Sequence, residues 1–113
     1  MSDTVQYLPA IALRGTTILP GMIVHFDVSR KKSVKALEKA MVEDQRVFLI
    51  TQKIPQTEDP GQEDLYRIGT IAVIKQLVKT KNGIIQVLVE GKERGELLHL
   101  DEDGFFLEAE VGV

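Results

Sequence analysis

The dipeptide Asn82-Gly83 places the strongest constraint on the fold of this chain, because Asn-Gly marks a tight turn between two antiparallel strands. Residues 69–79 precede it and residues 84–90 follow it, and both segments are rich in apolar residues. The second segment also alternates, with apolar side chains at Ile85, Val87 and Val89. The sequence therefore predicts a β-hairpin around this turn.

Five further segments have the composition of strands. They cover residues 8–14, 23–28, 46–52, 97–100 and 105–111. Four apolar residues are predicted to face one side of the last strand: Phe105, Leu107, Ala109 and Val111. A turn is predicted at Leu19-Pro20-Gly21, because proline presets its own φ and glycine accepts the positive φ of a type II turn.

One helix is predicted, over residues 30–44. Val34, Leu37 and Met41 recur there at helical spacing, which indicates a narrow apolar stripe on the outside of a sheet or barrel. Ser29 is the expected N-cap, because a serine hydroxyl can accept a hydrogen bond from the first helical turn.

Six or seven strands and one helix, without an alternating strand–helix pattern, predict a mostly β (α+β) fold. We expect a mainly antiparallel, partly closed barrel or curled sheet, crossed by the helix. At 113 residues, of which 43% are hydrophobic, the chain suits a single domain spanning residues 1–113.

Composition narrows the class of function. Cysteine is absent, which excludes disulfides and thiolate metal sites and suits a reducing compartment. The net charge of −3 disfavours nucleic acid as the main partner. The N-terminus has no basic and apolar regions of a signal peptide, and no apolar run approaches the ~20 residues of a membrane span. We expect a soluble, cytoplasmic domain without membrane contact.

No set of residues is arranged for catalysis, a cofactor or a metal. None of the three serines lies in a Gly-x-Ser-x-Gly elbow, and His25 and His99 lack spaced ligand partners. Residues 91–95 lack the spacing of a phosphate loop. Residues 101–104 resemble part of a calcium loop, but strands rather than helices are expected on both sides. The chain itself is therefore not expected to be an enzyme.

Several short blocks, in order between about residues 7 and 94, carry a family resemblance. They are Leu8–Gly15, Leu19–Met22, Arg30–Ser33, Thr51–Lys53, Gln62–Thr70 and Val87–Arg94. In these blocks the chain resembles the N-terminal, substrate-recognition domain of the bacterial ATP-dependent Lon protease (endopeptidase La).

The resemblance implies a PUA-like pseudo-barrel that is a fragment of a longer, ATP-dependent serine endopeptidase. The ATPase module with its ATP and Mg²⁺, and the catalytic Ser–Lys dyad, would lie downstream of this chain. The domain would recognise or tether unfolded and damaged polypeptides in protein quality control. It would also contact other subunits of a homo-oligomer.

Two groups of residues are candidates for the polypeptide-binding surface. One is basic: Arg30, Lys31, Lys32 and Lys35. Cations oppose the dipole at a helix start, which suggests a role other than helix stability, whereas the alternative is a solvated polar face. The other group is apolar and comprises Leu19, Met22, Ile54 and Tyr66. Lys31 and Ser29 depart from the family pattern, in which an acidic residue and a glycine are frequent.

The alternative function is a free-standing PUA-like module that binds RNA through the basic helix start. Against it stand the negative net charge and the shortage of aromatic residues for base stacking.

Overall fold

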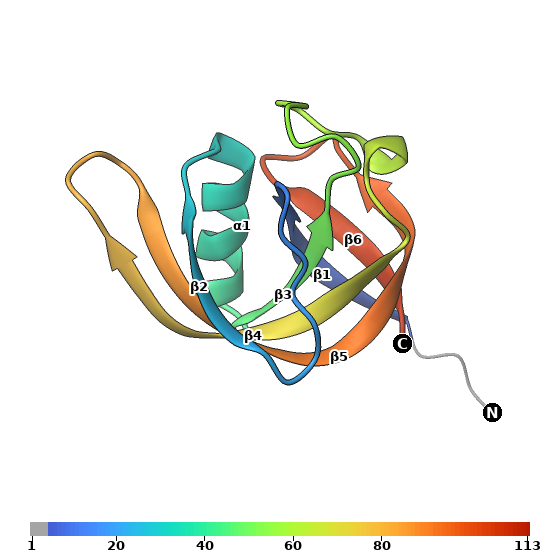
Figure 1. Ribbon diagram of the computed structural model, residues 1–113, viewed down its shortest axis with the longest axis horizontal. Coiled ribbons are helices and arrows are strands. Elements are labelled where there is room, and N and C mark those ends of the chain that lie inside the picture. Colours follow the sequence, from blue (N-terminus) through green and yellow to red (C-terminus); the bar gives the residue numbers. More distant parts are fainter. Residues whose placement is uncertain (1–4) are drawn as a thin grey trace.

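The computed structural model describes residues 5–113 and consists of six strands and one α-helix (Figure 1). The elements are β1 (Val5–Leu13), β2 (Ile23–Val28), α1 (Lys31–Met41), β3 (Arg46–Thr51), a 3₁₀ turn (Gln62–Asp64), β4 (Ile68–Lys79), β5 (Ile85–Asp101) and β6 (Leu107–Gly112). The expectation for the extreme N-terminus falls largely on residues 1–4, which lie outside the described residues. No helix within residues 5–113 is both long enough and apolar enough to cross a membrane.

The strands form one curled sheet in the order β2-β5-β4-β3-β1-β6, and β6 also pairs with β5. This second pairing closes one side of the sheet, whereas β2 pairs with β5 alone among the described strands. All pairs are antiparallel except β1 with β3. The predicted mainly antiparallel, partly closed barrel is therefore confirmed.

The predicted hairpin joins β4 and β5. The loop has three residues, Lys81–Gly83, and the Thr80 N–H donates to the Ile84 carbonyl at 2.9 Å. Gly83 takes a φ of 79°, which glycine adopts without strain. Figure 1 shows this hairpin projecting beyond the body of the molecule.

The predicted break between residues 84–90 and 97–100 is wrong, because β5 runs unbroken through both segments. Gly91 and Gly95 are buried, and they allow close approach rather than ending the strand. A Cβ at Gly91 would collide with the Leu19 carbonyl, and one at Gly95 with the side chain of Val111. The pairing of β5 with β4 shifts register near Gly91, so the strand bends without ending.

The helix begins and ends differently from the prediction. Its N-cap is Arg30, with extended backbone angles and no side-chain cap, so the assignment of Ser29 as N-cap is wrong. The backbone is still extended at Arg30, so the helix begins one residue later than a cap at Ser29 would place it. The helix ends at Met41 rather than at residue 44, and Gln45 has a φ of 64°.

The buried face of α1 is made of small residues around Leu37, namely Ser33, Ala36 and Ala40. Val34 is only partly buried, and Met41 is 39% exposed, so the predicted stripe is rotated. Small side chains let the helix approach β1 and β3 closely, where it packs against a core cluster that includes Val47 and Leu49.

A second core cluster lies on the other face of β3, around Phe48 and Ile50. The successive apolar residues of β3 therefore serve both clusters, so this strand is covered on both faces. The prediction that Phe105 shares one side of the last strand with Leu107 is wrong, because the Phe105 side chain is 86% exposed and that of Leu107 is buried. The chain bends until β6 begins at Leu107, and Phe106 packs against the first cluster instead.

Candidate functional site

The turn between β1 and β2 presents two apolar side chains to solvent. The Met22 N–H donates to the Leu19 carbonyl at 3.1 Å, and Gly21 has a φ of 88°, as a type II turn requires. Gly91 fastens this turn to β5 by accepting from the Gly21 N–H and donating to the Met22 carbonyl, both at 2.8 Å. Leu19 and Met22 are 44% and 37% exposed on this rigid support.

Two further exposed apolar residues continue from this turn. Leu19 and Ile68 line one shallow hollow, and Ile68 and Tyr66 line the next. Ile68 is 55% and Tyr66 51% exposed. We call Leu19, Met22, Tyr66 and Ile68 the apolar patch. Beneath it the buried Thr70 hydroxyl donates to the Ile18 carbonyl at 2.5 Å, which ties the β1–β2 connection to β4.

Sequence reasoning missed Ile68 as a surface residue. Its position directly before the predicted strand over residues 69–79 was the available signal, because such a residue lies outside the alternating core positions. Nothing in the sequence, however, indicated which strand end would meet the Leu19 turn.

The basic cluster lies elsewhere. Arg30 Nη2 donates to the Thr57 carbonyl at 3.1 Å, and Lys32 Nζ donates to the Glu102 carbonyl at 3.1 Å. Lys32 also lies 3.8 Å from an Asp59 carboxylate oxygen, and Lys35 lies 3.5 Å from Glu38. Within residues 5–113 only the Lys31 side chain among these four has no hydrogen bond or ion pair. Two of the four side chains, Arg30 and Lys32, therefore hold neighbouring loops, and Lys35 pairs within the helix.

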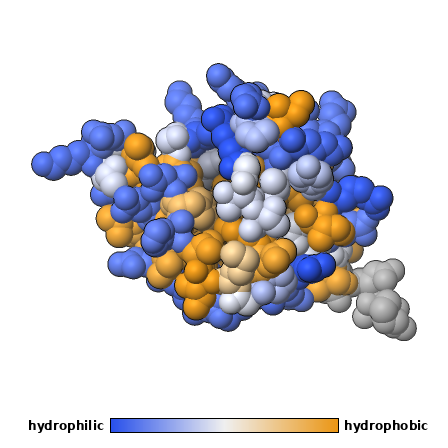
Figure 2. Space-filling model, viewed as in Figure 1, coloured by the Kyte–Doolittle hydropathy of each residue, from blue (hydrophilic) through white to orange (hydrophobic). Residues whose placement is uncertain are grey.

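Ile54 belongs with these loops. It is 60% exposed, and its carbonyl accepts from Gln52 Nε2 at 3.0 Å. The same amide also donates to the Thr57 carbonyl, the group that Arg30 binds. The sequence-predicted surface thus separates into two regions. Figure 1 shows the start of α1 at the top of the view and the β1–β2 turn at the bottom, and Figure 2 shows hydrophilic residues dominating the top and hydrophobic ones gathering lower down.

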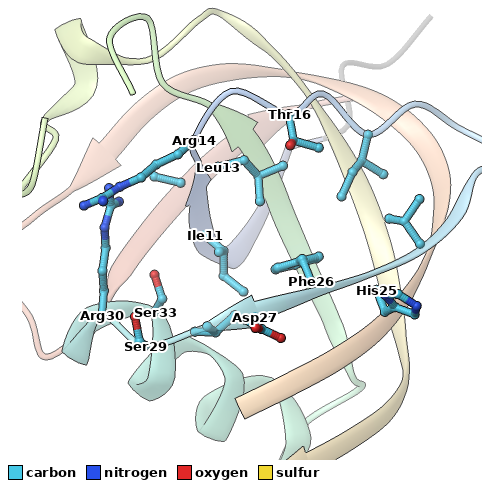
Figure 3. Close-up of a pocket in the computed structure, with 14 residues that line it drawn as sticks. Ile11, Leu13, Arg14, Thr16, His25, Phe26, Asp27, Ser29, Arg30 and Ser33 are labelled. Atoms are coloured by element: carbon cyan, nitrogen blue, oxygen red, sulfur yellow. The ribbon is translucent and has the colours of Figure 1, made fainter. Parts of the chain in front are cut away.

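A groove separates β2 from the end of β1 and has a volume of about 410 Å³. Its floor is apolar, with Ile11, Leu13 and Phe26, whereas Arg14 and Arg30 lie at one end (Figure 3). Burial and the nearby charge of Arg14 lower the pKa of the Arg30 guanidinium, while Asp59 and Glu58 act in the opposite direction. Two arginines therefore share one end of this groove.

No group of three or more potential metal ligands occurs in the described part of the chain. A curled, partly closed sheet crossed by one helix defines the class of this protein, a mostly β domain, and the apolar patch and the groove are its two candidate binding surfaces.

Comparison with known proteins places this module in a family. Residues 7–113 match the model of the ATP-dependent protease La (LON) substrate-binding domain, and the chain belongs to that family. The resemblance inferred from the short sequence blocks is therefore confirmed. The matching family describes a substrate-binding domain of the protease, which agrees with the expectation that this chain carries no catalytic centre of its own.

Similar proteins include the Lon protease of Heliobacterium modesticaldum, 54% identical over 96 residues, and that of Lachnoclostridium phytofermentans, 46% identical over 111 residues. These alignments cover 85% and 98% of this chain but only 12% and 14% of the relatives. The chain thus spans a small part of each relative's length. None of these relatives supports the RNA-binding alternative.

Two solved structures share the fold. The N-terminal domain of the Mycobacterium avium complex Lon protease has a TM-score of 0.72 and 23% identity, over 94% of this chain and 53% of that chain. The Lon N-terminal domain protein of Xanthomonas campestris has a TM-score of 0.71 and 15% identity, over 94% of this chain and 58% of that chain.

Proposed function

We propose that this domain recognises and tethers unfolded or damaged polypeptides for an ATP-dependent protease, and that the apolar patch makes the contact. The observation that carries the proposal is the exposure of four large apolar side chains on backbone that is hydrogen-bonded to the sheet. Folded proteins bury such side chains and unfolded ones expose them, so an apolar patch favours unfolded chains without reading a sequence.

The surrounding charge fits the same role. Arg67 and Arg94 border the hollows that the apolar patch lines. Long basic side chains cover apolar surface with their aliphatic stems and keep their charged ends in water. Both stems would support contacts to apolar segments. Because Arg67 is paired with Glu96, Arg94 is the one that would also attract acidic segments. The remaining parts of the proposal are a cytoplasmic location and a longer chain whose other parts would bind ATP and Mg²⁺ and carry the catalytic residues.

An NMR titration of the ¹⁵N-labelled chain with a permanently unfolded protein tests the proposal. We expect chemical shift changes centred on the apolar patch, and none with the folded form of the same protein or with a short RNA. Leu19→Ser and Tyr66→Ser should weaken the changes. Val78→Ser is the matched control, because Val78 is 45% exposed on the projecting hairpin. Equal losses with all three variants, or shifts with RNA alone, would contradict the proposal.

Subunit contact is a second candidate function, favoured by the hairpin of β4 and β5. Figure 1 shows this hairpin projecting from the body of the molecule. Val78, near the end of β4, is exposed. Two results would make subunit assembly the better explanation of what the domain does. The titration would show no binding of unfolded protein, and Val78→Ser would change the assembly of the longer protein.

A further inference from the structure

The outer edge of β2 has unpaired backbone groups. The Gly91 N–H donates to the Met22 carbonyl, and residues of a strand point their backbone groups alternately to its two sides. His25 and Asp27 consequently direct their N–H and C=O groups away from β5. No other described strand pairs with β2, so these groups offer a template for one more strand.

The facing wall of the groove is open as well. Pairing of β1 with β6 ends at Ala10, so among the strands of residues 5–113 only β3 pairs with residues 11–13 of β1. Apolar side chains lie between the two walls, with Ile11 and Leu13 opposite Phe26 (Figure 3), and Asp27 is among the polar residues that also line the groove. The six residues of β2 are about 20 Å long at ~3.3 Å per residue, enough for five or six residues of an added strand.

One end of the groove is suited to an anion. Figure 3 shows the Arg14 and Arg30 side chains directed toward each other at the end of β2. Arg30 is fixed by its bond to the Thr57 carbonyl. Arg14 is exposed and has no hydrogen bond or ion pair within residues 5–113. The repulsion between the two guanidinium groups, which contributes to the lowered pKa of Arg30, would be relieved by a carboxylate placed between them.

We propose that this groove binds an extended segment of a polypeptide as an added strand along β2, with an Asp or Glu side chain of that segment held by Arg14 and Arg30. The inference rests on the proposed function and specifies one part of it, because it defines the chemistry of the segments that are held most tightly. Asp27 lines the middle of the groove, so a second acidic residue at the centre of the segment would be repelled.

Synthetic peptides test the carboxylate. An eight-residue apolar peptide with acetyl and amide ends and one terminal Asp is compared with the same peptide carrying Asn. We expect binding of the Asn peptide, measured by fluorescence anisotropy, to be weaker by about tenfold, the usual effect of losing a charge-assisted hydrogen bond. Equal affinity would overturn the proposal. Equally tight binding of a peptide that has a free C-terminal carboxylate but no Asp would also overturn it, by identifying chain ends as the ligand.

Two protein variants test the arginines. Arg14→Gln should lower the affinity for the Asp peptide by about tenfold and leave the affinity for the Asn peptide nearly unchanged. Because Arg14 makes no bond in the described chain, this change should not disturb folding, which the ¹⁵N spectrum would verify. Lys81→Gln, at the exposed tip of the hairpin, removes one positive charge away from the groove and should have little effect. The same loss with both variants would reduce the effect to overall charge and contradict the proposed site.

Strand addition has its own test. Proline is tolerated on an edge strand where the lost N–H faces outward, so His25→Pro should keep the sheet but block the added strand. Phe26→Pro would remove an N–H directed toward β5 and should disrupt the fold, which makes it the contrasting variant. If His25→Pro fails to fold, a peptide with alternate N-methylated amides provides the same test on the normal chain. Unchanged binding of the N-methylated peptides would exclude strand addition.

The comparison with Leu19→Ser distinguishes this inference from the proposed function. If Leu19→Ser loses binding of unfolded protein while Arg14→Gln binds both peptides normally, the groove proposal fails and the apolar patch remains. If neither unfolded protein nor peptide binds the normal chain, both proposals fail together.

Discussion

At the scale of single residues, Gly91 connects the core to the apolar patch. It exchanges hydrogen bonds with the Leu19–Met22 turn, and a Cβ there would collide with the Leu19 carbonyl and lie 3.2 Å from Thr70 Cγ2. We predict that Gly91→Ala lowers the free energy of unfolding by about 1–3 kcal/mol, because the added methyl group must displace the turn. Urea denaturation followed by circular dichroism measures this loss.

Gly104→Ala is the control for that experiment. Gly104 is exposed, and the nearest atom to an added Cβ is the Phe106 carbonyl oxygen at 3.6 Å. The free energy of unfolding of this variant should lie within about 0.5 kcal/mol of that of the normal chain. A similar loss at both glycines would mean that the collision at Leu19 is not responsible, because the reduced freedom of the unfolded chain favours folding.

Asp44 predicts a pH dependence. Its carboxylate accepts a 2.9 Å hydrogen bond from Arg46 Nε. Partial burial raises the pKa of this carboxyl, but the hydrogen bonds and the charge of Arg46 outweigh that effect. The pKa of Asp44 therefore lies below its ordinary 3.8. A lowered folded-state pKa stabilises the protein above 3.8, and this contribution is lost as the pH falls through the folded value. Asp44→Asn should therefore reduce stability at pH 7 by less than about 1 kcal/mol. Denaturation curves of the two proteins should converge in acid; a difference that grows in acid would contradict this.

The residue-scale predictions from sequence succeeded where the cause is local. Pro20-Gly21 dictated a turn that leaves Leu19 and Met22 exposed, as expected for a candidate surface. The environment of Lys32 was not accessible in the same way, because its partner carbonyl at Glu102 is 70 positions away. Whether the eight candidate residues bind polypeptide remains a prediction.

At the scale of elements, periodicity located the strands but not all of their ends. Alternation continued Phe105 into the last strand, whereas the structure begins β6 at Leu107. We predict that Phe105→Ser changes the free energy of unfolding by less than about 0.5 kcal/mol, because the side chain is 86% exposed. Leu107→Ala, at a position only 5% exposed, should cost about 2–5 kcal/mol. If denaturation experiments give comparable losses for Phe105→Ser and Leu107→Ala, Phe105 is part of the core and the prediction is wrong.

Local sequence signals also explain why two strands were predicted where the structure has the single strand β5. Glycine usually ends or interrupts a strand, and Gly91 and Gly95 lie close together in the sequence. The structure shows that both glycines are needed for tertiary packing, because each makes room for a group from another part of the chain. By contrast, the hairpin at Asn82-Gly83 was predictable because a turn depends on adjacent residues alone.

At the scale of the whole molecule, the apolar patch lies on one turn and one strand end, so a single domain offers only a small contact area. The predicted consequence, which rests on the proposed function, is weak binding by one copy and much stronger binding by linked copies. Two copies joined by a flexible Gly/Ser linker should hold an unfolded protein at least about a hundredfold more tightly than one, the lower range for linked sites. Surface plasmon resonance at low ligand density measures both. The control is the same tandem with Leu19→Ser in one copy, which keeps the size and linker but should bind like a single domain. Tight binding by that control, or no gain in the intact tandem, would show that recognition does not depend on repeated weak contacts.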